Sequence, residues 1–214
     1  MTSKQFLLGL AGAGLALLTT GCPSAAADGP ARGKTLYANC VSCHGADGSG
    51  NHTYGAPAIA GMSTWYLEAQ LKKFRSGARG THPRDVEGMR MRPMSQTLAS
   101  DADVTNVAAY VASLPARKPA PTVLDGNAAT GAQLFATCTA CHGATGAGNE
   151  ALKAPPLSGN HDWYLLAQLR KFKEGVRGAN PEDTTGALMR PMAQTLVDEQ
   201  AMKNVVAHIM TLSR

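Results

Sequence analysis

The pentapeptide Cys40-Val41-Ser42-Cys43-His44 constrains this chain more than any other stretch, and its pattern returns at 138–142. Cys-x-x-Cys-His is the pattern of covalent c-type haem attachment, in which each cysteine forms a thioether to a haem vinyl group. The histidine beside the second cysteine supplies the proximal nitrogen to the iron. The predicted haem-binding residues are therefore Cys40, Cys43 and His44 for one group and Cys138, Cys141 and His142 for another.

A zinc site and a redox-active cysteine pair are the other interpretations of a Cys-x-x-Cys spacing. A zinc site would need further cysteine or histidine ligands at a matching spacing. A redox pair would not need the histidine that follows both copies of the motif. The agreement of the two copies favours two covalently bound haem c groups.

The region around these motifs is a duplication with a constant offset of 98 residues, and it needs no gap from Gly33 to Leu114. A repeat of this kind predicts two domains with one layout. We expect a first domain at 31–115, a Pro-rich linker at 116–124 and a second domain at 125–214. Identical residues at the offset include Trp65/Trp163, Gln70/Gln168, Phe74/Phe172, Gly77/Gly175, Arg79/Arg177, Met91/Met189, Pro93/Pro191, Leu98/Leu196 and Asn106/Asn204.

The pattern of apolar residues predicts an all-α fold, with about three main helices in each domain. The expected helices are at about 30–39, from residue 63 or 64 to 76, and from residue 100, then at about 126–137, 162–174 and 198–212. Gly77 is placed to cap the second helix. The apolar stripe of the third is Val104, Val107, Ala108 and Val111. Between the second and third helices we expect a loop rich in Gly, Pro, Met and Arg.

Composition agrees with a small core completed by a cofactor. Only 5% of the 214 residues are aromatic, and a covalently held haem is a large apolar plate that could complete a thin core. The formal net charge is +5, of which Lys4 lies in a predicted leader. Two haems would add up to four propionates and roughly cancel the excess, so nucleic-acid binding is not indicated.

The first 22 residues have the pattern of an export leader: basic Lys4, an apolar run from Phe6 to Leu18, and small residues before Cys22. The fifth cysteine, Cys22, follows Gly21 as in the lipobox of bacterial lipoproteins, where the cysteine is lipidated. An ordinary cleaved signal peptide and an uncleaved anchor are the alternatives. All three predict an exported, periplasmic protein, and the lipobox predicts a membrane anchor. Residues 23–30 are small and polar, as expected of a flexible tether.

A methionine is the expected sixth ligand of each iron, because His/Met ligation raises a haem's potential and closes the iron to other ligands. Both domains carry Met-Arg-Pro-Met before the third helix, at 91–94 and 189–192. The residues alone leave open whether Met91 and Met189 ligate or Met94 and Met192 do. Rival ligands would be the histidines outside the motifs, but none of them is duplicated at the offset: His52, His82, His161 and His208.

Other duplicated residues are candidates for the surroundings of each haem. An iron-bound imidazole usually gives its other N–H to an acceptor, and the carbonyl groups of Pro57 and Pro155 are the candidates, with a plain turn as the alternative. Trp65 and Trp163 could donate an indole N–H to a propionate or fill the core. Four arginines could pair with propionates or remain solvated: Arg79, Arg92, Arg177 and Arg190.

These residues resemble two class I cytochrome c domains in tandem, and the chain is most similar to the cytochrome c4 family. The resemblance covers about 31–214 and depends on the two haem motifs, the methionine segments and a pattern Trp-Tyr-Leu-x-x-Gln-Leu-x-Lys-Phe at 65–74 that the second domain repeats. In that family the ligating methionine lies seven residues before a leucine, which corresponds to Met91 and Met189. The family also implies propionates that face each other across the domain boundary and electron delivery to terminal oxidases.

We therefore expect a two-haem carrier of single electrons between respiratory donors and acceptors, with an oxidase or a quinol-oxidising complex as partner, either free or as a subunit of a larger complex. The alternative is a haem enzyme, a peroxidase or a thiosulfate-type oxidoreductase, which would need one open iron site. A redox or gas sensor is a third class, but nothing in the chain resembles an output domain.

Overall fold

The computed structural model describes residue 1, residues 29–123 and residues 125–212. The predicted leader, the lipidation site Cys22 and nearly all of the predicted tether lie outside these residues. In the described residues all regular elements are helical, apart from two isolated bridges that join Asn51 to Ala56 and Asn149 to Ala154. The predicted all-α class is confirmed. None of the helices in this part of the chain is long and apolar enough to cross a bilayer.

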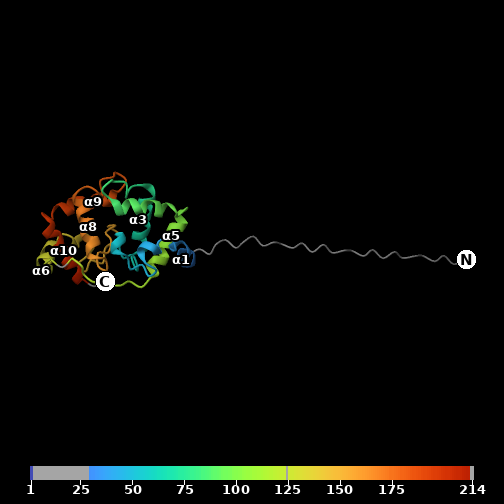
Figure 1. The fold of residues 1–214 in the computed structure, drawn as a ribbon, viewed down its shortest axis with the longest axis horizontal. Helices are drawn as coiled ribbons and strands as arrows, with labels where there is room; N and C mark the ends of the chain where they lie inside the picture. Colours follow the sequence, from blue (N-terminus) through green and yellow to red (C-terminus); the bar gives the residue numbers. More distant parts are fainter. Residues whose placement is uncertain (2–28, 124, 213–214) are drawn as a thin grey trace.

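The helices fall into two halves with the same order. The first half contains α1 (Pro30–Tyr37), α2 (Val41–His44), the 3-10 helix η1 (His52–Tyr54), α3 (Thr64–Ser76), α4 (Val86–Gln96) and α5 (Asp101–Ser113). The second contains α6 (Ala128–Phe135), α7 (Thr139–His142), α8 (Asp162–Lys173), α9 (Thr184–Gln194) and α10 (Glu199–Thr211). In Figure 1, α1 and α5 lie at one end of the molecule, α6 and α10 lie at the other, and α3 and α8 lie between them.

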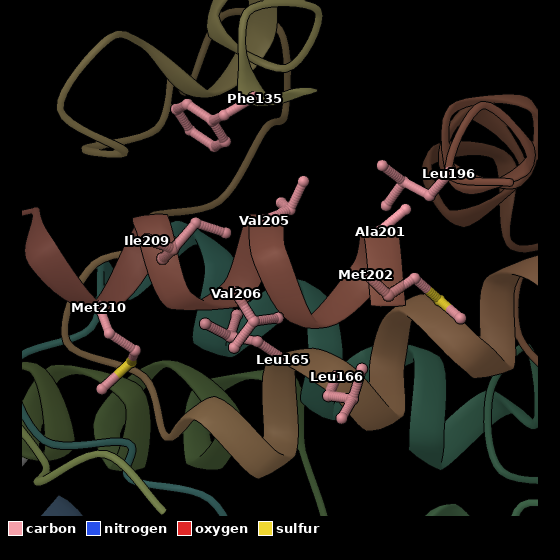
Figure 2. Close-up of a cluster of buried hydrophobic side chains, with 10 residues drawn as sticks. All are labelled: Phe135, Leu165, Leu166, Leu196, Ala201, Met202, Val205, Val206, Ile209 and Met210. Carbon is pink, nitrogen blue, oxygen red and sulfur yellow. The ribbon is translucent and has the colours of Figure 1, made fainter. Parts of the chain in front are cut away.

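Each half has its own apolar core. In the first, the predicted stripe of α5 is buried against α1 and α3. In the second, Val205 and Ile209 of α10 point toward Phe135 while Val206 points toward α8 (Figure 2). In both halves the first and last helices pack closely at a glycine. A Cβ added to Gly33 would lie 2.0 Å from the Asn106 carbonyl oxygen, and one added to Gly131 would lie 1.8 Å from the Asn204 carbonyl oxygen. The duplicated glycine therefore fixes how the two helices cross.

The predicted helix ends agree well with the structure. Gly77 caps α3 with φ at 91°, and the Ser100 side chain at the start of α5 accepts a hydrogen bond from the Asp103 N–H. The short helices α2, α7 and η1 were not predicted.

The prediction of a loop before the third helix is wrong, because the methionine segments form α4 and α9. Both helices begin at a buried aspartate whose side chain accepts a hydrogen bond from a glycine N–H three residues later, Asp85 from Gly88 and Asp183 from Gly186. A capping bond of this kind stabilises a helix start. Pro93 and Pro191 lie inside these helices, where each removes one N–H donor without ending the helix.

Candidate functional site

Each half contains an apolar cavity beside its Cys-x-x-Cys-His motif. The first cavity has a volume of about 770 Å³ and is lined by Cys40, Cys43 and His44 together with Met91 and Met94 of α4. The predicted covalent, proximal and methionine residues of the first half therefore all line the same cavity.

The second cavity is smaller, about 230 Å³, and repeats this lining. Cys138, Cys141 and His142 line it together with Met189 and Met192 of α9. Apolar side chains from α6, α8 and α10 make up much of the rest of the wall.

The two motif histidines are held in one orientation by the prolines predicted for this role. His44 Nδ1 donates to the Pro57 carbonyl oxygen at 3.0 Å, and His142 Nδ1 donates to the Pro155 carbonyl oxygen at 2.8 Å. Both rings are only 5% exposed, and burial lowers the pKa of each imidazole. A neutral ring with its proton at Nδ1 keeps the Nε2 lone pair for a metal.

The cysteine thiols lie in a partly buried region. Burial, with a smaller contribution from Cys43, raises the pKa of Cys40 to about 11, and burial also raises the pKa of Cys138. Neither thiol is therefore expected to ionise readily near neutral pH before it is attached to a group.

The two methionines of α4 lie on one helix face, since residues three apart in a helix are neighbours. This face also presents Glu87, Gly88 and Ser95 to the first cavity, and Met91 lies in its middle. Met94 lies toward the edge and is 37% exposed. In α9, Thr185, Gly186 and Met192 surround Met189 in the same way.

The histidines outside the motifs do not form a second ligand set. His82 accepts from the Arg84 N–H, and the ring of His208 packs on Phe135. His52 does line the first cavity, but its ring contacts Trp163 at 4.8 Å between centroids. His161 stacks on the same indole and its Nε2 lies 2.8 Å from the Ser49 carbonyl oxygen.

Each of the two tryptophans lines the cavity of the opposite half. Trp163, from the second half, lines the first cavity, and Trp65, from the first half, lines the second. Trp65 and Trp163 are the second residues of α3 and α8, which lie at the middle of the molecule, and each indole reaches the other half's cavity. Each indole therefore belongs to the surroundings of the other half's cavity, a placement that the sequence did not indicate.

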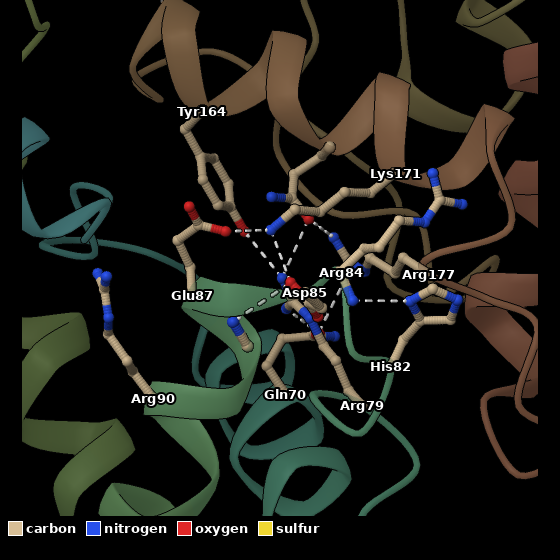
Figure 3. Close-up of polar contacts among 12 residues, drawn as sticks. Gln70, Arg79, His82, Arg84, Asp85, Glu87, Arg90, Tyr164, Lys171 and Arg177 are labelled. Atoms are coloured by element: carbon tan, nitrogen blue, oxygen red, sulfur yellow. Dashed lines mark hydrogen bonds and ion pairs between the residues drawn. The ribbon is translucent and has the colours of Figure 1, made fainter.

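Arg79 and Arg177 form a buried network at the boundary between the halves (Figure 3). Arg79 donates to Gln70 Oε1 at 2.7 Å and Gln168 Oε1 at 3.1 Å, and Arg177 donates to the same two oxygens at 3.1 and 2.8 Å. Each guanidinium is 8% exposed and lies 4.5 Å from a phenylalanine ring. All these acceptors are neutral, and in the described residues neither guanidinium forms a direct ion pair; the charge of Asp85 acts on Arg79 from a longer distance, and Asp85 is itself paired with Lys171.

The network fits haem propionates. Arg79 lines the first cavity and Arg177 the second, and the Nε of each is buried with no hydrogen-bond partner in the described residues. A buried charge of this kind is costly unless an anion compensates it. Arg92 and Arg190 do not share this position: they lie beside Gly77 and Gly175 at the ends of α3 and α8 and line neither cavity.

Sequence reasoning missed most of the boundary. Besides the two arginines and two glutamines, the residues that bond across the boundary include Lys73, Lys171, Asp85, Asp183, Glu87 and Tyr164. The constant offset marks Gln70 and Gln168, but nothing in the sequence says that a residue of one half contacts the other half. In the described residues no group of three or more His, Cys, Asp or Glu side chains is placed to hold a bare metal ion.

Comparison with known proteins agrees with this geometry. The family model described as Cytochrome c matches twice, at residues 30–115 and 128–213. The thiosulfate dehydrogenase electron acceptor of Stutzerimonas stutzeri strain A1501 is 35% identical over 212 residues, which cover 92% of this chain and 93% of that protein. Cytochrome c4 of Azotobacter vinelandii is 32% identical over 197 residues, covering 85% and 88%.

A solved structure shows the same fold. Reduced recombinant cytochrome c4 from Pseudomonas stutzeri superposes with a TM-score of 0.70 at 29% identity, over 87% of this chain and 100% of that one.

Proposed function

Because this chain belongs to the cytochrome c family, with two of its domains in tandem, we propose that it carries single electrons between periplasmic redox proteins. The duplicated domain gives it two covalently bound haem c groups and a role in electron transfer. The observation that supports a carrier is that both cavities are lined by one buried histidine, two cysteines and the two methionines of the Met-Arg-Pro-Met segment, with Met62 as an additional methionine in the first. The cysteine, histidine and methionine positions that would hold the haem and its iron are the same in the two halves.

The proposed ligands of the first iron are His44 and Met91, and those of the second are His142 and Met189. Met91 and Met189 are preferred to Met94 and Met192 because they lie in the middle of the cavity face of their helices. Cys40 and Cys43, and Cys138 and Cys141, hold the thioethers. Arg79 and Arg177 face propionates with their free Nε groups.

Haem c supplies a reversible one-electron couple when bound. The residues of the chain orient and enclose the haem and set its midpoint potential. The Pro57 and Pro155 carbonyl groups fix the two imidazoles, because each accepts the Nδ1 proton. The thioether sulfurs of Met91 and Met189 would hold the iron together with the imidazoles and so leave no place for a substrate, and the apolar walls would limit the access of water. The site can then exchange electrons but offers no open metal for bond-making chemistry.

We further propose domains at 31–115 and 125–214 and an export leader at 1–22, with Cys22 lipidated and the protein on the periplasmic face of a membrane. A thiosulfate-oxidising enzyme is the proposed donor, since a relative that spans 92% of this chain is named for accepting electrons from thiosulfate dehydrogenase. A terminal oxidase is the proposed acceptor, because the carrier's ligation favours a high potential.

Anaerobic mixing of the oxidised protein with thiosulfate tests the carrier role against the enzyme alternative. Thiosulfate alone should leave both haems oxidised, whereas thiosulfate plus a catalytic amount of thiosulfate dehydrogenase should reduce both, followed by absorption. Reduction by thiosulfate alone would mean that the chain is itself the oxidoreductase. A protein that stays oxidised with the dehydrogenase but is reduced by dithionite would contradict the proposed donor.

A further inference from the structure

Two lysines cross the boundary between the halves at equivalent positions. Lys171 of α8 donates to Asp85 Oδ1 at 2.6 Å and to Glu87 Oε2 at 2.5 Å, both at the start of α4 (Figure 3). Lys73 of α3 donates to the Asp183 carboxylate and the Thr185 hydroxyl at the start of α9. The offset of 98 residues relates every member of one set to a member of the other.

The two sets differ at one position, where the first half has Glu87 and the second has Thr185. Glu87 lines the first cavity and Thr185 lines the second. Burial raises the pKa of Glu87, but the hydrogen bond from Lys171 outweighs it, and the net pKa lies below its ordinary value. The carboxylate is therefore ionised at neutral pH. Lys171 has two carboxylate partners where Lys73 has one.

The other charge differences between the cavities offset each other. Arg90 lines the first cavity where the second has Leu188, and Lys153 lines the second where the first has Gly55. Each is an exposed cation, so each half gains one solvent-screened positive charge. The remaining charged residues on the first cavity's lining, apart from the duplicated Arg79, are ion-paired: Asp125 with Lys203 and Arg170 with Glu199. Glu87 is also ion-paired, but Lys171 with its two carboxylates carries one net negative charge, whereas Lys73 with Asp183 carries none. This net charge is the difference that remains between the two cavities.

A negative charge beside a redox centre disfavours the state that holds one more electron. The Glu87 side chain is 46% exposed, so water screens part of this effect, while its partner Lys171 is 14% exposed. We propose that Glu87 holds the first haem at a lower midpoint potential than the second, so that an electron on the singly reduced protein resides mainly in the second half. This inference depends on the proposed function, since it assumes the same pair of axial ligands at both irons. Glu87 acts through the electrostatic effect of its charge and does not bind the iron.

A reciprocal exchange tests this inference, because the chain supplies its own reference residue at each site. In the holoprotein, Glu87→Thr should raise the midpoint potential of the first haem and leave the second within error. Thr185→Glu, with Lys73 as its expected partner, should lower the potential of the second haem. The double exchange should reverse the order of the two. Potentials are measured by spectroelectrochemical titration and assigned to each half by NMR of the haem methyl groups.

Two further variants separate charge from structure. Glu87→Gln keeps the shape and should give the same upward shift as Glu87→Thr. Glu68→Gln removes a carboxylate of α3 that lines neither cavity, and it should shift neither potential. The inference is overturned if the wild-type protein has two low-spin haems and the exchange at position 87 moves neither potential, or moves both equally. Wild-type protein without two low-spin haems would instead overturn the proposed function.

Discussion

The buried carboxylate of Asp162 joins the end of the linker to the start of α8. It is the first residue of α8 and is 1% exposed. Its oxygens accept hydrogen bonds from the Thr122 hydroxyl at 2.8 Å and from the backbone N–H groups of Val123 at 2.5 Å and Trp163 at 2.7 Å. The end of the Pro-rich linker is therefore fixed to the second half. The first half has Thr64 at this place, so the repeat gives no sign of this contact.

We expect Asp162→Asn to lower the free energy of unfolding at pH 7 by about 1–3 kcal/mol, the usual cost of leaving buried donors without an acceptor. Burial raises the pKa of Asp162, but the N–H donors outweigh it, so its folded pKa lies below the ordinary value. The stabilisation is thus fully present above about pH 4, the ordinary pKa of aspartate, and is lost as the pH falls through the lower folded pKa.

Thermal unfolding followed by circular dichroism from pH 7 down to pH 2 checks this expectation. The difference between wild type and Asp162→Asn should shrink at the acid end. Thr122→Val removes only one of the donors that lower the pKa of Asp162, so it should cost less and weaken the pH dependence only in part. A difference that stays constant down to pH 2 would show that the charge of Asp162 is not the cause.

At the scale of single residues, five consecutive residues specify the predicted covalent and proximal positions, and the structure places them on one cavity in each half. The Pro57 and Pro155 carbonyl groups could also be placed, since iron-bound imidazoles need an acceptor. The tryptophans could not, because a periodic pattern shows that Trp65 begins a helix but not which half of the molecule the helix end reaches.

At the scale of helices, apolar spacing and capping residues predicted α3 and α5 within a residue or two. The same reasoning failed for α4 and α9, where proline, glycine and arginine outweighed the helical signal of the methionines. The aspartate caps and the cavity that buries one face of each helix compensate for these residues. Tertiary packing of this kind commonly overrides local propensity.

Gly33→Ala tests the close crossing of α1 and α5. The added Cβ would lie 2.0 Å from the Asn106 carbonyl oxygen, so the α5 backbone must move. We expect a loss of about 1–3 kcal/mol or more in the free energy of unfolding, as for other overpacked sites. Lys34→Ala on the exposed face of the same helix is the control. Urea denaturation that gives equal midpoints for the two variants would contradict the crossing geometry.

At the scale of the whole molecule, duplication predicted two equal halves but not how they contact each other. The contacts between the halves cannot be inferred from the sequence. Two arginines donate to two glutamines at the boundary, and two lysines each bond to the start of the methionine-containing helix of the other half. The halves share polar contacts beside both cavities, so each half forms part of the other's haem surroundings. Two haem centres in such an arrangement can influence each other's potential.

The claim on which this account depends is that each iron is closed between one imidazole and one methionine sulfur. Low-spin haem is quantified by absorption and electron paramagnetic resonance in wild type and in Met91→Leu and Met189→Leu, with Met94→Leu and Met192→Leu as matched controls. We expect two low-spin haems in wild type and in both controls, and one high-spin haem with a lowered potential in each of the other two variants. Fewer than two haems or a high-spin site in wild type, or a Met91→Leu protein that keeps both haems low-spin, would contradict the account.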